Sequence, residues 1–188
     1  MLWPGISIEV LPQLNSTNTE LMERARQGQL FPTVLVAEHQ TAGRGRMGKV
    51  WQSQQKAGAS LTFSIGLPWQ SPHLSGLSLV VGYSIAQALD PLQHMGLQLK
   101  WPNDIWVNRH KLGGILIELC SQGQHKYVVI GIGINIMQPP ALPSDANRHA
   151  MPPTWLQAHL PHITAGMALQ QIVPTLLPQL QEFAQPGF

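Results

Sequence analysis

A chain of 188 residues can bury one sizeable hydrophobic core, and we expect a single domain over residues 1–188. Hydrophobic residues make up 44% of the chain and Asp, Glu, Lys and Arg only 11%, a composition that argues against a disordered or coiled-coil protein. The formal net charge of +2 is too small to indicate binding to the phosphate backbone of nucleic acid. The sequence has no apolar run of about 18 residues, so no membrane span is predicted.

The chain has one cysteine, Cys120, which permits no intramolecular disulfide. This cysteine closes an apolar segment and has no electropositive neighbour, so we interpret it as a buried hydrophobic residue rather than a nucleophile. Disulfides are rare in reducing compartments, and the N-terminal residues do not have the charge and hydropathy pattern of a secretory signal. We therefore expect a cytoplasmic protein.

Strands and one helix are predicted in the first part of the chain. The strands, identified by alternating or β-branched apolar residues, are residues 6–10, 33–37 and 61–65. A helix follows the first strand, because Thr17 and Glu20 have the spacing of a capping box and Gly28 suits the position after a last turn. Glycine and cationic residues are concentrated in residues 40–60, which predicts a loop.

The rest of the chain combines helix and strand patterns. A helix is predicted at residues 74–89, and strands are predicted at residues 97–100, 105–107, 114–119 and 127–134. Residues 138–153 have the composition of a mobile loop. The final segment has helical apolar spacing, but Pro174 and Pro178 predict a kink or two short helices there. Many strands with few helices indicate an α+β domain with helices packed against one sheet.

Residues 43–50 form a glycine-rich, cationic segment that matches nucleotide-binding patterns only in part. No βαβ unit surrounds it, as a dinucleotide fingerprint requires, the companion motifs of a kinase are missing, and Val50 stands where a P-loop needs Ser or Thr. Glycines let backbone amides approach a ligand, and cations supply charge-assisted donors. The residues of these two kinds are Gly43, Gly45, Gly48, Arg44, Arg46 and Lys49. The segment predicts an anion site, with a solvated basic hairpin as the alternative.

Residues 100–104, Lys-Trp-Pro-Asn-Asp, form a polar cluster at the end of a predicted strand. Pro102 fixes the turn, and Asn103 offers both a hydrogen-bond donor and an acceptor. Asp104 can hold magnesium or orient an amine. The alternative is a polar turn with a packed Trp101.

Two further polar residues flank apolar strands. Lys111 precedes two glycines, where its ammonium can serve as a point charge for a phosphate or carboxylate, unless it is simply the tip of a hairpin. Asn135 ends an apolar strand with an amide able to pair with a purine edge, although asparagine is common at strand ends. The histidines have no metal-ligand spacing, so no transition-metal site is predicted.

Taken in this order, the polar segments of the chain resemble the catalytic core of biotin-protein ligases. The matching stretches are residues 16–18 (Ser-Thr-Asn), 40–51, 100–104, 111–116 and 131–135. The resemblance implies an α+β fold, with a central mixed β-sheet and helices packed on one side, related to class II aminoacyl-tRNA synthetases. It also implies a catalytic core without an N-terminal DNA-binding domain and without a C-terminal β-barrel domain.

The reaction that the resemblance implies has two steps. The biotin carboxylate attacks the α-phosphate of MgATP, which releases pyrophosphate and leaves biotinyl-5′-AMP. A lysine of a biotin carboxyl carrier protein, such as a subunit of acetyl-CoA carboxylase, then attacks the mixed anhydride and AMP departs. Biotin, ATP and Mg²⁺ are therefore the implied ligands, and a homodimer is left open. The first step brings two anions together, so cations must offset their repulsion.

The resemblance also implies roles for individual residues. It implies that Arg46, Lys111 and Asp104 are catalytic, and that Asp104 binds Mg²⁺ or helps to position the incoming lysine. The implied biotin-binding residues are Ser16, Thr17, Gln40, Gly43, Arg44, Trp51 and Gly114. The implied nucleotide-binding residues are Gly45, Lys49, Asn103 and Asn135.

Two other functions stay open at the level of the sequence. One is a lipoate ligase or octanoyl transferase of the same fold, although the usual Arg-Arg and Gly-Gly-Gly signature with a His-Asp pair is missing. The other is a non-catalytic biotin or biotinyl-AMP binding protein, which needs fewer cations than this chain supplies. Formation of an adenylate distinguishes a ligase from such a binding protein.

Overall fold

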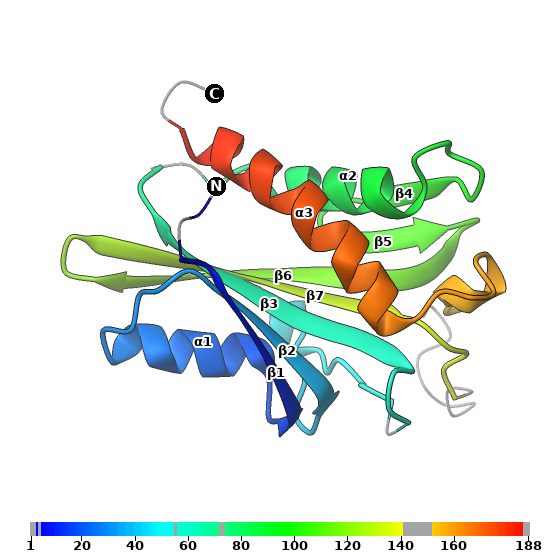
Figure 1. The fold of residues 1–188 in the computed structure, drawn as a ribbon, viewed down its shortest axis with the longest axis horizontal. Helices are drawn as coiled ribbons and strands as arrows, with labels where there is room; N and C mark the ends of the chain where they lie inside the picture. Colours follow the sequence, from blue (N-terminus) through cyan, green and yellow to red (C-terminus); the bar gives the residue numbers. More distant parts are fainter. Residues whose placement is uncertain (1–2, 4, 55, 72–73, 141–151, 186–188) are drawn as a thin grey trace.

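The computed structural model describes residues 3, 5–54, 56–71, 74–140 and 152–185, and it contains one seven-stranded sheet (Figure 1). The strands are β1 (Ser7–Leu14), β2 (Thr33–Gln40), β3 (Ser60–Trp69), β4 (Leu97–Lys100), β5 (Asp104–Val107), β6 (His110–Gln122) and β7 (His125–Asn135). They lie in the order β1-β2-β3-β7-β6-β5-β4. The β1–β2 pair is parallel and the other pairs are antiparallel, which confirms the mixed sheet that was predicted.

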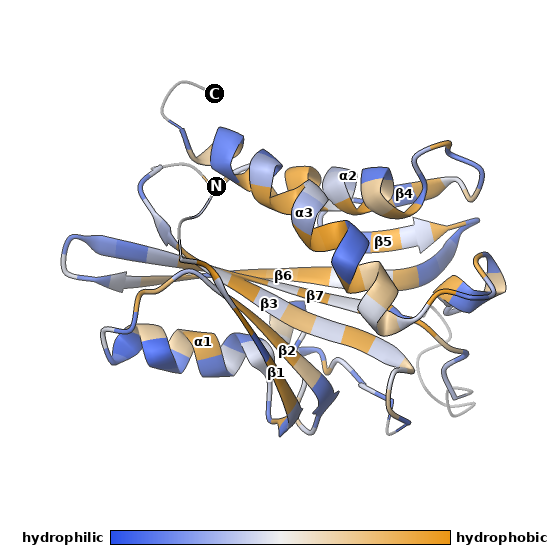
Figure 2. Cartoon of the chain, in the orientation of Figure 1, coloured by the Kyte–Doolittle hydropathy of each residue, from blue (hydrophilic) through white to orange (hydrophobic). Residues whose placement is uncertain are grey.

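Helices cover both faces of this sheet. Helices α2 (Leu77–Leu89) and α3 (Ala165–Ala184) pack on one face, and α1 (Thr17–Arg26) packs on the opposite face (Figure 1). The expectation that all helices lie on one side is therefore wrong for α1. The cause lies in the central strands, which are rich in hydrophobic residues on both faces (Figure 2), so each face needs a cover.

The two faces can be followed along β2. Val34 and Val36 belong to the large core beneath α2 and α3, whereas Leu35 points to the other side and belongs to a smaller core. That smaller core also contains Leu21 and Ala25 of α1. A strand places successive side chains on opposite faces, so one β-branched run supplies both cores.

The first turn of α1 starts one residue earlier than the sequence predicts. Its N-cap is Ser16, whose hydroxyl accepts a hydrogen bond from the amide of Thr19 at 3.4 Å. The capping-box assignment to Thr17 and Glu20 is therefore wrong by one position. Because Thr17 is not the cap, its side chain is free to contact β2 instead, and that contact shapes the candidate site.

The C-terminal segment forms one helix, α3, that runs through both prolines. The prediction of two short helices is wrong, and the prediction of a kink stays a prediction. Pro174 is exposed, while Ile172, Leu176 and Leu180 form the buried stripe of the helix. In the part of the chain that the structure describes, no helix is long and apolar enough to cross a membrane. Most of the predicted loop at residues 138–153 lies outside the described residues.

The buried Tyr127 of β7 is expected to make the fold less stable at alkaline pH. Its hydroxyl donates a hydrogen bond to the carbonyl of Phe31 at 2.7 Å, and burial raises the pKa of this phenol from 10.0 to about 12. In the unfolded chain the phenol ionises near its ordinary pKa, so its contribution to stability is complete below pH 10 and is lost as the pH rises to 12. We expect this group to lower the free energy of unfolding by about 2 kcal/mol over that interval.

Urea denaturation at several pH values tests this expectation. The native chain should lose stability more steeply than Tyr127→Phe between pH 10 and pH 12. Below about pH 9, the variant should be less stable by about 1 kcal/mol, because it lacks the hydrogen bond to Phe31. Parallel pH profiles for the two proteins would contradict the prediction.

Candidate functional site

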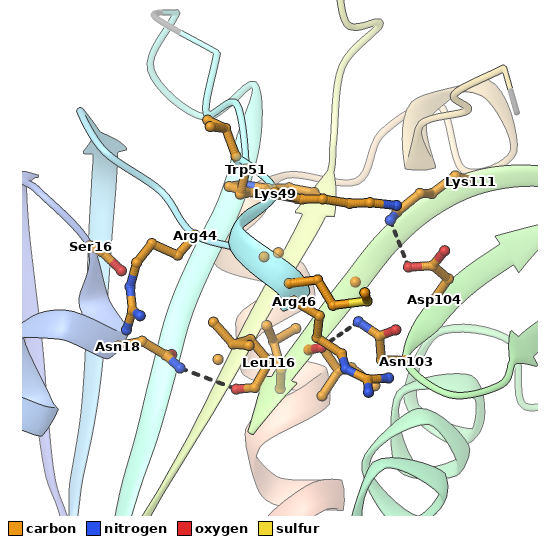
Figure 3. A pocket seen from close by; sticks show the side chains of 18 of the residues that line it. Ser16, Asn18, Arg44, Arg46, Lys49, Trp51, Asn103, Asp104, Lys111 and Leu116 are labelled. Carbon is orange, nitrogen blue, oxygen red and sulfur yellow. Dashed lines mark hydrogen bonds and ion pairs between the residues drawn. The ribbon is translucent and has the colours of Figure 1, made fainter. Parts of the chain in front are cut away.

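A cavity of about 450 Å³ lies on the α1 face of the sheet (Figure 3). Its floor is the backbone of β6 and β7, one wall is the first turn of α1 together with the end of β2, and the opposite wall is the turn between β4 and β5. The glycine-rich segment, residues 43–50, borders the opening. The fold thus brings together the polar segments that were singled out along the sequence.

All but two of the predicted site residues line this cavity. They are Ser16, Thr17, Gln40, Arg44, Gly45, Arg46, Lys49, Trp51, Asn103, Asp104, Lys111 and Gly114. The exceptions are Gly43 and Asn135. The carbonyl of Gly43 accepts a hydrogen bond from the Trp51 amide at 2.9 Å, and a Cβ at this glycine would lie 2.5 Å from the Trp51 carbonyl oxygen.

The buried Asn135 donates a hydrogen bond to the carbonyl of Thr154 at 3.0 Å. This contact ties the end of β7 to the segment before α3, so the structure gives Asn135 a place in the scaffold. Gly43 likewise allows the glycine-rich segment to close on Trp51. The ligand roles predicted for these two residues stay predictions.

The wall formed by α1 and β2 is a network of neutral polar groups. The Oε1 atom of Gln40 accepts hydrogen bonds from the amide of Thr17 at 2.7 Å and from its hydroxyl at 3.1 Å. Because a backbone N–H can only donate, this contact fixes which way the Gln40 amide is turned. Both side chains are buried, so this wall presents oriented donors and acceptors of the kind that an uncharged polar ligand needs.

The opposite wall carries charge. Nζ of Lys111 lies 2.6 Å from Oδ1 of Asp104 (Figure 3). Asn103 is held beside this pair by two hydrogen bonds to Ile115. Its side-chain Nδ2 donates to the carbonyl of Ile115 at 2.9 Å, and its main-chain carbonyl accepts from the Ile115 amide at 2.8 Å. These bonds fix the cluster against β6. A Cβ at Gly114 would lie 3.8 Å from both Asp104 Oδ1 and Lys111 Nζ, so a longer side chain there would enter the ion pair.

Positive charge dominates the lining of the cavity. Among the described lining residues, Asp104 is the only carboxylate, whereas the cations are Arg44, Arg46, Lys49, Lys100 and Lys111. A partly enclosed cavity with an excess of cations favours an anionic ligand. This arrangement supports the predicted anion site and argues against the solvated-hairpin alternative.

The glycine-rich segment closes on itself as a compact turn. The Gly45 amide donates to the carbonyl of Lys49 at 2.7 Å, and the Lys49 amide donates to the carbonyl of Arg46 at 3.1 Å. Gly48 has φ +73° and Met47 has φ +54°, a backbone region that glycine adopts far more easily than methionine. The Met47 side chain is 93% exposed at the tip of the turn.

Some lining residues received no assigned role from the sequence. Gly131 and Gly133 of β7 form part of the floor, and Asn18 belongs to the α1 wall. A Cβ at Gly131 would lie 2.1 Å from Asn18 Oδ1, and one at Gly133 would lie 2.6 Å from the Trp51 ring. The signal was present in the sequence, because two glycines at alternate positions of an apolar strand indicate close approach of other groups to one face.

Metal-ligating side chains are not clustered in the part of the chain that the structure describes. No group of three or more His, Cys, Asp or Glu residues that could hold a metal ion occurs within the described ranges. Asp104 offers a single carboxylate, and one of its oxygens already contacts Lys111. This donor set does not form a metal cage of the protein's own, but it fits an ion that brings most of its ligands with it, as magnesium does on nucleotide phosphates.

Comparison with known proteins gives a consistent result. Residues 10–135 match the model of the biotin/lipoate A/B protein ligase family. The chain is 40% identical over 134 residues to the bifunctional ligase/repressor BirA of Escherichia coli, a match that covers 70% of this chain and 41% of that protein. It is 37% identical over 140 residues to the biotin--[acetyl-CoA-carboxylase] ligase of Mycobacterium tuberculosis, covering 71% and 50%. The chain spans about half the length of these curated relatives or less.

Solved structures show the same architecture. The biotin protein ligase of Aquifex aeolicus in complex with biotin and ATP superposes with a TM-score of 0.76 at 30% identity, covering 96% of this chain and 72% of that one. The biotin protein ligase of Leishmania major in complex with biotinyl-5-AMP gives 0.75 at 25% identity, covering 96% and 76%. A lipoate complex of Plasmodium falciparum LipL1, at 11% identity and a TM-score of 0.62, shares the fold alone.

Proposed function

The chain belongs to the biotin/lipoate A/B protein ligase family, and from that premise we propose that it is an ATP-dependent biotin-protein ligase. The observation that carries the proposal is one cavity with a neutral hydrogen-bonding wall and a cationic wall facing each other. Biotin has a matching division, because its ureido head is neutral and its carboxylate is charged. The relatives of Aquifex aeolicus and Leishmania major bind biotin, ATP and biotinyl-5-AMP, which supports the same ligands here.

The proposed first step joins the biotin carboxylate to the α-phosphate of ATP. A carboxylate oxygen forms the new bond to phosphorus, the bond to the bridging oxygen of the β-phosphate breaks, and pyrophosphate leaves. Arg46 and Lys111 offset the charge that gathers between carboxylate and phosphate, and Lys49 adds to this field. In the second step the amine of an acceptor lysine attacks the carbonyl carbon of the anhydride and AMP departs.

The remaining wall residues hold the substrates in place. Ser16, Thr17 and Gln40 bind the ureido head, and the backbone at Gly114 borders it. Trp51 packs against the ligand. The proposed contacts of the nucleotide are with Gly45, Lys49 and Asn103 of the lining, and with Asn135 at the end of β7. Fixed donors and a shaped wall contribute to catalysis by orienting the two reacting groups.

Magnesium belongs to this proposal as part of the MgATP substrate. Asp104 is the residue that would hold the ion, together with phosphate oxygens and water. A bound Mg²⁺ supplies positive charge at the phosphates. Asp104, which now pairs with Lys111 at 2.6 Å, would then share its carboxylate with the ion, and the Lys111 ammonium would be available to the biotin carboxylate and α-phosphate.

The acceptor and the assembly are also proposals. Relatives named biotin--[acetyl-CoA-carboxylase] ligase occur in Mycobacterium tuberculosis and Paracoccus denitrificans. We therefore propose that the acceptor is the biotin carboxyl carrier protein of such a carboxylase. A homodimer and a cytoplasmic location stay predictions.

Mass spectrometry of the small molecules formed by the purified chain tests the proposed function. Incubation with biotin and MgATP should yield biotinyl-5′-AMP, with octanoate and lipoate as parallel substrates. An adenylate of lipoate or octanoate, and none of biotin, would assign the sister activity instead. A folded protein that gains thermal stability with biotin but forms no adenylate would be a binding protein, contrary to the proposal.

A further inference from the structure

A chain of hydrogen bonds runs from the α1 wall of the cavity to the glycine-rich segment. It consists of Thr17, Ser64, Asn18, Glu118 and Arg44, which we call the Glu118 network. These residues come from α1, β3, β6 and the segment 43–50, so no single element contains the network. Ser64, Asn18 and Glu118 have no part in the binding and catalytic roles proposed above.

The inner half of the network is buried. Oγ of Ser64, which is fully buried, lies 2.6 Å from Thr17 Oγ1 and 2.6 Å from Asn18 Oδ1. The Asn18 amide then donates from Nδ2 to the carbonyl of Leu116 at 3.2 Å and to Oε2 of Glu118 at 2.9 Å. The Leu116 contact is drawn in Figure 3. Both ends of the Asn18 amide are therefore engaged, which holds Glu118 at a fixed distance from the first turn of α1.

The outer half of the network holds the glycine-rich segment. The same oxygen of Glu118 that accepts from Asn18 lies 2.6 Å from Nη2 of Arg44. The Nε of Arg44 donates to the hydroxyl of Thr19 at 3.0 Å. Charge-assisted bonds of this kind are shorter and stronger than neutral ones. Figure 3 shows Arg44 on the α1 side of the cavity, next to Asn18.

Arg44 is a suitable point at which to anchor this segment. It directly precedes the compact turn that starts at Gly45, and it forms an isolated β-bridge with Val50 on the returning side. The far side of the turn is fixed separately, where the Trp51 ring packs on Gly133. Removing the Glu118 contact would therefore release one of two anchors and leave the other in place.

We propose that Glu118 is a positioning residue that, through Arg44, holds the glycine-rich segment over the neutral wall of the cavity. The proposal rests on the proposed function and refines it: Arg44 orients the segment instead of contacting biotin itself. Because Thr17 and Gln40 form the proposed ureido site, the Glu118 network links the head-group end of biotin to the segment that covers it. Loss of this contact should therefore weaken the binding of the acid substrate, biotin, and change the binding of ATP little.

The substitution Glu118→Gln tests the proposal. Glutamine keeps an oxygen for Asn18 but removes the charge that holds Arg44. We expect KM for biotin to rise about tenfold while kcat for adenylate formation and KM for ATP change less than about twofold. The matched control is Glu23→Gln, which removes an exposed ion pair with Arg26 on α1, 3.3 Å long, and should change none of these parameters.

Amide hydrogen exchange of the ligand-free protein gives a readout that needs no catalysis. In Glu118→Gln the amide of Gly45, which is hydrogen-bonded in the closed segment, should exchange about tenfold faster, while the core of β7 should exchange as before. If the native chain forms no biotinyl-5′-AMP, the proposed function fails, and this measurement still decides whether Glu118 holds the segment.

A double-mutant cycle with Arg44→Gln separates positioning from a general loss of charge. If Glu118 acts through Arg44, the double variant should show no higher KM for biotin and no faster amide exchange than the more impaired of the two single variants. Additive effects of the two substitutions would overturn the proposal. So would unchanged exchange at Gly45 in Glu118→Gln, or an equal loss of kcat and of affinity for biotin and ATP.

Discussion

Lys111→Ala is expected to lower the rate of biotinyl-5′-AMP formation about 100- to 1000-fold while the protein stays folded. Two anions react in the proposed first step, and the Lys111 ammonium stands on the cationic wall beside Asp104. Without it, the remaining Asp104 carboxylate would repel the reacting groups. The fold should survive, because Lys111 contributes to the scaffold through its backbone, which bonds to Pro152 and Thr154.

Single-turnover measurement of the adenylate, with the melting temperature determined in parallel, checks this expectation. Lys126→Ala is the matched control, because it removes an exposed cation on β7 outside the cavity and should leave the rate unchanged. Lys111→Arg keeps the charge but replaces a compact ammonium by a planar group, so its rate should fall between those of the native chain and Lys111→Ala. Turnover near the native rate in Lys111→Ala would remove this residue from the proposed mechanism.

Local sequence patterns predicted most strands but not their full extent. The apolar run 127–134 identified nearly the whole length of β7, because a strand buried on both faces needs hydrophobic residues throughout. The neighbouring β6 is much longer than the predicted 114–119, running from His110 to Gln122. Its polar ends are held by pairing with β5 and β7, and that pairing is not visible in the residues of the strand itself.

The helices show where a local pattern is insufficient. Nothing within α1 tells which face of the sheet it covers; that choice follows from Leu35 and Val129, which need burial on the side away from α2 and α3. In α3 the effect of an interior proline depends on where the proline lies around the helix. Pro174 faces solvent, and the packing of Ile172 and Leu176 against the core maintains the helix through it.

The candidate site was predictable where one residue type carries a recognisable chemistry. Glycine with arginine, or a lysine before two glycines, indicates an anion site from the local sequence alone. Glu118 gave no such signal, because its partners Arg44 and Asn18 stand 74 and 100 residues away in the sequence. Positioning residues of this kind become visible only when the fold has placed their partners.

Gly133→Ala is the second substitution with a large expected effect, a loss of biotin affinity of about 30-fold. A Cβ at this position would lie 2.6 Å from Cε2 and 2.7 Å from Cζ2 of Trp51, closer than atoms pack. The indole must then move away from its place in the wall of the cavity. This movement is costly, because the Trp51 amide is bonded to Gly43, whose own close packing fixes the backbone there.

Calorimetric titration of biotin into each variant measures this loss, and two further proteins show its origin. Gly166→Ala in the first turn of α3, where a Cβ meets nothing within 4 Å, should bind biotin as the native chain does. In a Trp51→Ala background the clash is gone, so adding Gly133→Ala should change affinity less than about twofold. A full loss of about 30-fold in that background would mean that the alanine methyl obstructs biotin directly, and that Trp51 does not transmit the effect.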